Sequence, residues 1–320
     1  MGTREYSRSS FKTLMEKTGY PITSIEKAFR LMDILDYISK NEFLSKNLAL
    51  KGGTAINMVY YQNIPRLSVD LDFDLAENSP KEKMLVIKNE VAQQLRTLAS
   101  ELNYTIQEHS HGYILYQSDL YYWNSVGNRD KIKMDINCLQ RCHIYETEIK
   151  EFKNPFTEKA QTTRILSEYE LFGAKLKALL ERHTPRDIFD TYMMSKNKLF
   201  QDENSSNNIR KALVYYISIS KEIDLGSSLQ AIKSKPIREF KLHLFPMLKT
   251  GYGFVDRDDI TTQAVTYVSQ FLDFKDNELL YLKAAKNGEY HPHLLFHDGT
   301  EKRIEENPAA KFYISKELGG

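Results

Sequence analysis

Three aspartates alternate with apolar residues in the segment RLSVDLDFDL, residues 66–75. Side chains along a strand point to opposite faces in turn, so the apolar set is expected to face a core and the acids to line one polar face. Neighbouring carboxylates there would lie about 6.6–7 Å apart and could converge on a divalent cation, which would offset their repulsion. We therefore expect Asp70 and Asp72 to be metal ligands and Asp74 to be peripheral. The alternative is a solvated acidic strand face.

A glycine pair precedes this strand. Gly52 and Gly53 follow the apolar run 48–50 and precede Thr54. Glycine permits a tight turn and close approach of a ligand to the backbone. A helix that begins near Thr54 would present free N–H groups and a positive dipole end to a phosphate. Lys51 either reaches that phosphate or is solvent-exposed. Together the two motifs indicate a bound nucleoside triphosphate with magnesium on the two aspartates.

The order of these motifs resembles a known superfamily. Gly-Gly-Thr followed by Asp-Leu-Asp is similar to the signature of polymerase-β-like nucleotidyltransferases. The fuller strings KGGTAI…RLSVDLDF and KLKALLER…PRDIFD resemble the AbiEii/MenT family of nucleotidyltransferase toxins, over most of the chain. The resemblance implies an enzyme of the EC 2.7.7 type that depends on Mg²⁺ or Mn²⁺ and transfers NMP from an NTP to an acceptor.

The resemblance also implies a third carboxylate on a neighbouring strand, which helps to activate the attacking hydroxyl. Asp135 fits, because it should point away from the apolar face of its strand. That apolar face is formed by Ile132, Met134 and Ile136. The alternative is a surface aspartate paired with Lys131 or Lys133.

Ser68 should share the face of Asp70, one alternation earlier. It would hydrogen-bond a phosphate or tune a metal ligand. In some family members the matching serine is phosphorylated by a partner. A phosphate there would add a charge of about −1.5 to −2 beside the carboxylates and block triphosphate binding. The alternative is a small polar strand residue.

Lys175 is expected on a helix, with Arg182 seven residues on along nearly the same face. A lysine that faces the cleft would neutralise the triphosphate and stabilise the transferring group. The resemblance favours this role, whereas spacing alone favours an exposed lysine.

The next helix should open with Pro185 after the cap residue Thr184. The resemblance implies a catalytic or nucleotide-contacting role for Asp187 and a nucleotide contact for Arg186, but favours no such role for Asp190. The alternatives are structural. Asp187 would complement the helix dipole, and Arg186 and Asp190 would form an i,i+4 ion pair.

The pattern of elements predicts an α+β, bilobed protein. A mixed-sheet nucleotidyltransferase domain flanked by helices is expected at residues 1–155, and an all-helical domain that contributes to the active-site cleft at 156–320. Expected strands are 113–116, 120–123 and 131–139, with a turn at 125–128. Expected helices include 81–102, 208–218, 264–274 and 277–285, with a polar loop at 201–208. A further helix should begin after the cap Ser167, with Glu168 and Glu170 as first-turn acids.

Composition narrows the class of protein. The 320 residues are 41% hydrophobic and 27% charged, as in a globular protein. No run is apolar enough to span a membrane, the N-terminus lacks a signal-peptide core, and the two cysteines are too few for a disulfide framework. We expect a cytoplasmic protein.

A nucleic-acid surface must be local, because the net charge is only +1. Phe240 and Phe245 are interleaved with basic residues, which favours an RNA-backbone surface or a solvated helix face. The basic residues are Lys233, Lys235, Arg238, Lys241 and Lys249.

The resemblance implies a toxin of a toxin–antitoxin pair, often tied to abortive infection and phage defence. Its acceptor would be the 3′ end of tRNA, which would stall translation. The cognate antitoxin would be a DNA-binding repressor or a kinase. The alternatives are a nucleotidyltransferase that acts on a protein or small molecule, and a GTP- or NTP-binding regulatory module without turnover.

Overall fold

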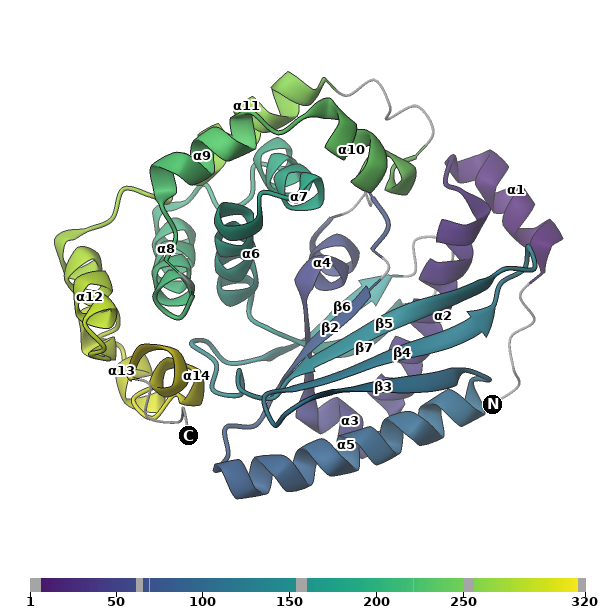
Figure 1. The fold of residues 1–320 in the computed structure, drawn as a ribbon, viewed down its shortest axis with the longest axis horizontal. Helices are drawn as coiled ribbons and strands as arrows, with labels where there is room; N and C mark the ends of the chain where they lie inside the picture. The colour runs from purple at the N-terminus through teal and green to yellow at the C-terminus, as the bar shows by residue number, and fades with distance from the viewer. Residues whose placement is uncertain are drawn as a thin grey trace. The chain divides into compact units, whose positions relative to one another are not determined.

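The computed structural model describes residues 7–61, 66–68, 70–153, 160–220, 222–249 and 256–315. The chain forms two compact units. Unit 1 lies within residues 1–141, 147–166 and 246–253, and unit 2 within 142–146, 167–245 and 254–320. The predicted α+β class is confirmed (Figure 1). The units are interleaved along the chain, whereas the sequence suggested one boundary near residue 155. The division into domains 1–155 and 156–320 stays a prediction.

Unit 1 contains the sheet. Its helices are α1 (Arg8–Thr18), α2 (Ile22–Lys40), α3 (Glu42–Asn47), α4 (Gly52–Ala55), which continues as a π-helical turn (Ile56–Tyr60), and α5 (Lys81–Glu101). Its strands are β1 (Leu48–Lys51), β2 (Asp70–Leu75), β3 (Thr105–His111), β4 (Leu115–Trp123), β5 (Arg129–Asn137), β6 (Glu148–Lys153) and β7 (Ala160–Ile165).

The seven strands follow the order β3-β4-β5-β2-β1-β7-β6. The pairs β2–β5 and β1–β7 are parallel and the others antiparallel, so the sheet is mixed. The predicted turn at 125–128 joins β4 to β5. The predicted strands 113–116 and 120–123 are instead one strand, β4, and its partner β3 was not predicted.

The two faces of the central strands differ in polarity. Ile132, Met134 and Ile136 of β5 are fully buried, and so are Leu71 and Phe73 of β2. This alternation confirms the predicted apolar face. Helix α5 runs alongside β3 and β4 (Figure 1). The opposite face of β2 and β5 carries the aspartates, so the hydrophobic core fixes which way the acids point.

Unit 2 is built from helices among its described residues. They are α6 (Glu168–Arg182), α7 (Pro185–Lys196), α8 (Glu203–Ser218), α9 (Leu225–Lys233), α10 (Ile237–His243), α11 (Arg257–Ser269), α12 (Asp276–Lys286), α13 (Thr300–Arg303) and α14 (Pro308–Ala310). Short 3₁₀ turns occupy Pro292–Leu294 and Phe245–Met247, the latter where the chain passes from unit 2 into unit 1. A π-helical turn occupies Lys311–Ser315. Across the described ranges of both units, no helix has the length and apolar character needed to cross a bilayer.

Local capping explains where these helices begin. Ser167 caps α6 and Thr184 caps α7, as predicted. The predicted polar loop 201–208 is wrong from Glu203 onward, because Asp202 accepts a hydrogen bond from the Ser205 N–H and begins α8 there. The predicted helix 264–274 begins earlier, at Arg257, and ends at Ser269.

Candidate active site

Sheet register brings the acidic residues of unit 1 together. Strand β2 lies between β1 and β5, with Asp72 opposite Lys51 on one side and Asp135 on the other. Asp70 is opposite Lys133 in the same register. Because β2 and β5 are parallel and in phase, their polar side chains share one face. The sheet therefore gathers Asp70, Asp72 and Asp135, as the sequence suggested.

The Asp72 carboxylate lies against the glycine turn. Gly52 has a φ of +72°, and a Cβ added there would lie 2.5 Å from Asp72 Oδ2. Only glycine avoids both the left-handed strain and this clash. Gly52 thus allows the start of α4 to follow β1 directly while it packs against the middle of β2. The glycine turn and the Asp72 carboxylate therefore depend on each other for their positions.

Electrostatics sets Asp72 apart from an ordinary surface acid. Burial raises its pKa, and the neighbouring Asp70 and Asp135 raise it further, while Lys51 and Lys133 act in the opposite direction. The charged form of Asp72 is therefore disfavoured by its surroundings. A cation at this place would relieve the repulsion among the three carboxylates.

Asp135 has partners of its own. Lys133 Nζ lies 2.7 Å from Asp135 Oδ2, and Gln117 Nε2 donates to Oδ1 at 2.7 Å. The pairing with Lys133, which the sequence left as the structural alternative, is therefore present. Lys131 pairs instead with Asp119, at 2.7 Å.

Lys51 is not simply solvent-exposed. Its ammonium forms an ion pair with Asp74, which is 1% exposed. The Thr54 hydroxyl donates to the Asp70 backbone carbonyl and ties α4 to the start of β2. Its single proton is thereby used, so the Thr54 hydroxyl would not donate to a phosphate while this hydrogen bond is kept. The roles of Lys51, Gly52, Gly53 and Thr54 in nucleotide binding stay predictions.

Gly53 lies beside a buried cation that sequence reasoning missed. A Cβ added at Gly53 would lie 2.8 Å from Arg66 Nη2 and 3.4 Å from Ser68 Oγ. Arg66 is 4% exposed and its backbone forms a β-bridge with Leu248. The available signal was that Arg66 is the nearest cation before the acidic strand.

Ser68 lies just before the acidic strand. It is buried and precedes β2, which begins at Asp70, so it is not part of that strand, and its predicted place on the face of Asp70 stays a prediction. The intervening Val69 lies outside the described residues. Ser68 nevertheless lies next to the glycine turn, and its proposed contact with phosphate does not depend on strand geometry.

The carboxylate oxygens of Asp70 and Asp72 suit a hard divalent cation that keeps some coordination positions for water and substrate. Among the described residues no three or more His, Cys, Asp or Glu side chains are placed so that together they could hold a metal ion. Magnesium commonly binds one or two carboxylates and completes its shell with water and substrate phosphates. Asp70 and Asp72 match that pattern better than they match a structural zinc or calcium site.

A second cluster of charged residues lies in unit 2. Lys175 on α6 is 7% exposed and pairs with Asp187 at 2.9 Å and with Asp190. Arg182 also binds Asp187, through Nε at 3.1 Å and Nη2 at 2.9 Å. Lys175 is thus buried and paired, not an exposed lysine, and Asp190 is its direct partner. The catalytic roles of Lys175 and Asp187 and the nucleotide contact of Arg186 stay predictions.

Asp187 holds α6 and α7 together. Burial opposes its ionisation, but Lys175 and Arg182 more than offset this and hold its pKa well below the usual value. Thr184 Oγ1 also donates to its Oδ2, at 2.7 Å. The predicted first-turn position of Asp187 is therefore correct, and the residue additionally forms a buried ion-pair network.

We expect Asp187→Asn to lower the free energy of unfolding by about 3 kcal/mol, because Lys175 loses one of two buried partners. The folded-state pKa lies below the unfolded value of 3.8, so this contribution is complete above pH 3.8 and is lost as pH falls further. Urea unfolding at several pH values measures it. Glu181→Gln, at a more exposed pair on α6, should have little effect. A loss that does not shrink below pH 3.8 would contradict this assignment.

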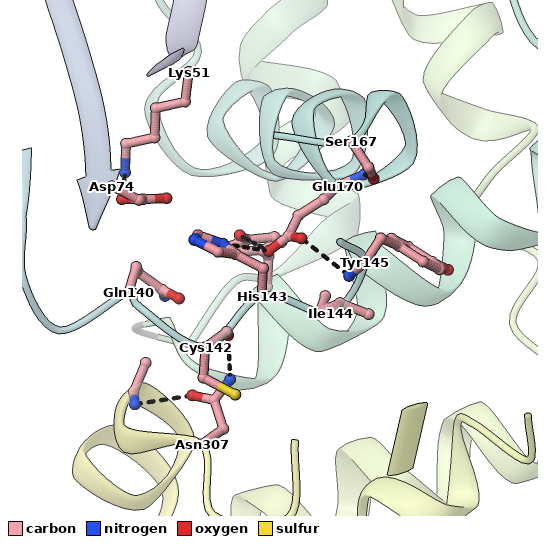
Figure 2. A network of polar contacts seen from close by, with 12 residues as sticks. Lys51, Asp74, Gln140, Cys142, His143, Ile144, Tyr145, Ser167, Glu170 and Asn307 are labelled. Atoms are coloured by element: carbon pink, nitrogen blue, oxygen red, sulfur yellow. Dashed lines mark hydrogen bonds and ion pairs between the residues drawn. The ribbon is translucent and has the colours of Figure 1, made fainter. Parts of the chain in front are cut away.

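Glu170 lies in the first turn of α6, as predicted, and also has partners from other segments. It is 1% exposed and accepts a hydrogen bond from the Tyr145 N–H at 3.2 Å (Figure 2). It accepts another from the Tyr216 hydroxyl at 2.8 Å. His143 Nδ1 lies 3.4 Å from the same carboxylate. Asn307 Nδ2 donates to the Cys142 carbonyl at 2.8 Å. Glu170 is thus a buried anchor for the segment 142–146 of unit 2, in addition to its place in the first turn of α6.

The basic stretch around α10 differs from the expected RNA surface. Phe240 is fully buried, so it is not available to stack on a base. Arg238 and Lys241 are exposed, but Lys249 Nζ lies 5.5 Å from the Tyr20 ring centroid in unit 1. The surface of α10 therefore presents the exposed cations Arg238 and Lys241 but not the aromatic ring of Phe240.

Comparison with known proteins decides the family. The profile of the AbiEii nucleotidyltransferase toxins, which belong to a type IV toxin–antitoxin system, matches residues 33–274. The chain belongs to the AbiEii family. The match spans both the glycine–aspartate motifs and the Lys175 cluster. The protein is therefore a nucleotidyltransferase, and its family implies an NTP substrate and a cognate antitoxin.

Solved structures agree on the fold of this AbiEii member. MenT4, a nucleotidyltransferase toxin of Mycobacterium tuberculosis, matches with a TM-score of 0.62 and 14% identity, over 96% of this chain and 99% of that one. A putative nucleotidyltransferase from H. pylori matches with a TM-score of 0.51 and 15% identity, over 78% and 94% of the two chains. A search of curated proteins by sequence found no match.

Proposed function

We propose that this AbiEii protein is a magnesium-dependent toxin that transfers NMP from an NTP to an RNA acceptor, the 3′ end of tRNA, and so blocks translation. The proposal rests mainly on the carboxylates of Asp70 and Asp72, which share one sheet face beside the Gly52 turn. Such an enzyme would act in the cytoplasm, in phage defence, under control of a DNA-binding or kinase antitoxin.

Asp70 and Asp72 would hold Mg²⁺ or Mn²⁺, which when bound neutralises phosphate charge. The backbone at Gly53 and the guanidinium of Arg66 would bind phosphate oxygens, with Ser68 beside them. Lys175, with Arg186, would neutralise further charge, and Lys175 would do so by exchanging one of its two carboxylate partners for phosphate. These groups would hold the α-phosphorus in line with the acceptor.

In the transfer, an acceptor hydroxyl oxygen bonds to the α-phosphorus, the α–β bridging bond breaks, and pyrophosphate leaves. The proton of this hydroxyl must pass to a base. Asp135 would take it after the acceptor hydroxyl replaces Lys133 or Gln117 at one carboxylate oxygen, since both oxygens already accept hydrogen bonds. Asp187 would act from its own ion-pair network, by fixing the position of Lys175.

The test is incubation with magnesium, each α-labelled NTP in turn, and either total tRNA or a protein lysate freed of RNA. We expect label on RNA from one preferred nucleotide, and none with Asp70→Ala/Asp72→Ala. Label that appears only on protein or on small molecules would overturn the RNA acceptor. Binding of an NTP without any transfer would indicate a regulatory module.

A further inference from the structure

The end of the β4–β5 hairpin in unit 1 carries a surface that the proposed function does not use. We define the hairpin-end surface as Tyr121, Trp123, Arg129 and Lys131. Trp123 is the one tryptophan of the chain, and it is 71% exposed. A single exposed apolar side chain is common on protein surfaces, so the neighbours of Trp123 decide whether it marks a binding site.

The register places these four side chains together. Trp123 is opposite Arg129, and Tyr121 is opposite Lys131. Alternate residues of paired strands share a face, so all four point to the same side of the sheet. The Arg129 guanidinium lies over the Tyr121 ring, 4.1 Å from its centroid, and Lys131 Nζ lies 5.7 Å from the same centroid. Two aromatic rings and two cations thus alternate over a small area.

The other side of the hairpin is already covered by α2. Arg30 lies over the Tyr122 ring at 4.0 Å, and Lys27 binds Asp130 at 2.8 Å. Tyr122 and Asp130 are the neighbours of Tyr121 and Arg129 along the strands, so they occupy the opposite face. The hairpin-end surface therefore faces away from α2.

The same strand face leads to the acidic cluster. From Arg129, every second residue of β5 lies on this face, through Lys131 and Lys133 to Asp135. Six residues of strand span about 20 Å. That is the length of about six stacked nucleotides, and fewer in an extended strand. A chain bound at the hairpin end would thus run along Lys131 and Lys133, which already pair with Asp119 and Asp135, to the carboxylates.

We propose that the hairpin-end surface binds the unpaired end of the RNA acceptor, by stacking bases on Trp123 and by pairing phosphates with Arg129 and Lys131. This inference rests on the proposed function for its choice of RNA. Aromatic rings interleaved with cations suit single strands, because every base has a π-face and every nucleotide a charge. Stacking of the bases within a duplex would hide those π-faces, so the surface should prefer single strands over duplex.

Trp123 supplies the assay, because its fluorescence comes from this surface alone. The whole protein is titrated, without NTP, with an oligoadenylate RNA of eight nucleotides and with a blunt RNA duplex. We expect saturable quenching by the single strand and at least tenfold weaker binding of the duplex. Quenching by neither RNA would overturn the proposal and point to a protein partner.

Variants separate specific from general charge effects. Arg129→Ala/Lys131→Ala should raise the Kd for the oligonucleotide about tenfold and reduce the slope of log Kd against log salt by about 1.4, for two lost phosphate contacts. The matched control is Lys83→Ala/Arg96→Ala on α5, which should change neither quantity. Trp123→Ala, followed by anisotropy of a labelled oligonucleotide, should weaken binding about tenfold. Equal Kd values for both double variants would overturn the proposal.

Label transfer to RNA distinguishes this inference from the proposed function. Transfer with an unchanged KM for RNA in Arg129→Ala/Lys131→Ala would overturn the hairpin-end surface and leave the proposed function standing. Quenching of Trp123 by the single strand without any label transfer to RNA would overturn the proposed function and leave the hairpin-end surface standing.

Discussion

Asp72→Asn is expected to lower nucleotidyl transfer by about 10³-fold or more while the protein remains folded. The amide keeps the shape of the side chain against Gly52 but removes the charge that would hold the cation. A loss of several kcal/mol of transition-state stabilisation corresponds to this factor. Initial rates of pyrophosphate release at saturating NTP measure it.

Stability of the same variant provides an independent readout. The charge on Asp72 is disfavoured by burial and by Asp70 and Asp135, so its removal should leave the melting temperature without metal unchanged or raised. The control is Asp130→Asn, on the opposite face of the sheet and paired with Lys27, which should retain activity. An inactive Asp72→Asn protein that melts lower would mean that Asp72 has a structural role instead.

Gly52→Ala is the second large effect. Its Cβ would lie 2.5 Å from Asp72 Oδ2, so the carboxylate or the turn must shift. A displacement of about 1 Å in a reacting group costs about 10²-fold in rate, and we expect kcat/KM to fall by that factor. The left-handed backbone adds about 1–2 kcal/mol of destabilisation.

Gly127→Ala separates these two causes. Gly127 has a φ of +84°, in the β4–β5 turn, and no atom lies within 4 Å of an added Cβ. Both variants should lose the stability that the left-handed backbone costs, and Gly52→Ala should lose more because of its clash with Asp72. Only Gly52→Ala should lose activity. Equal kinetics in the two variants would show that contact between Gly52 and Asp72 is unimportant for the reaction.

The acidic site was predictable because it depends on local periodicity. The apolar residues of β5 and β2 fix the face of Asp72 and Asp135, and the sequence contains that alternation directly. The pairing of the two strands followed from the family resemblance. The contact of Gly52 with Asp72 joins the glycine turn to β2. It depends on the φ angle of Gly52 and on the close approach of the turn to the strand, which no local sequence pattern specifies.

Other features depend on tertiary partners that sequence does not reveal. Glu170 looked like a first-turn acid, yet Tyr145 and Tyr216 come from distant segments to bind it. Phe240 looked interleaved with surface cations, but helix α10 turns it into the core. Arg66 had no predicted role, because its approach to Gly53 requires the chain to fold back.

The most direct test of the account follows the two ends of the triphosphate separately. The protein is incubated with magnesium, tRNA and the preferred NTP, labelled at either the α- or the γ-phosphate, with Asp72→Asn beside it. We predict α-label on the RNA, γ-label only in pyrophosphate, and neither product with the variant. Transfer of γ-label to the RNA, or α-label transfer that persists in Asp72→Asn, would contradict a nucleotidyltransferase that works through this carboxylate.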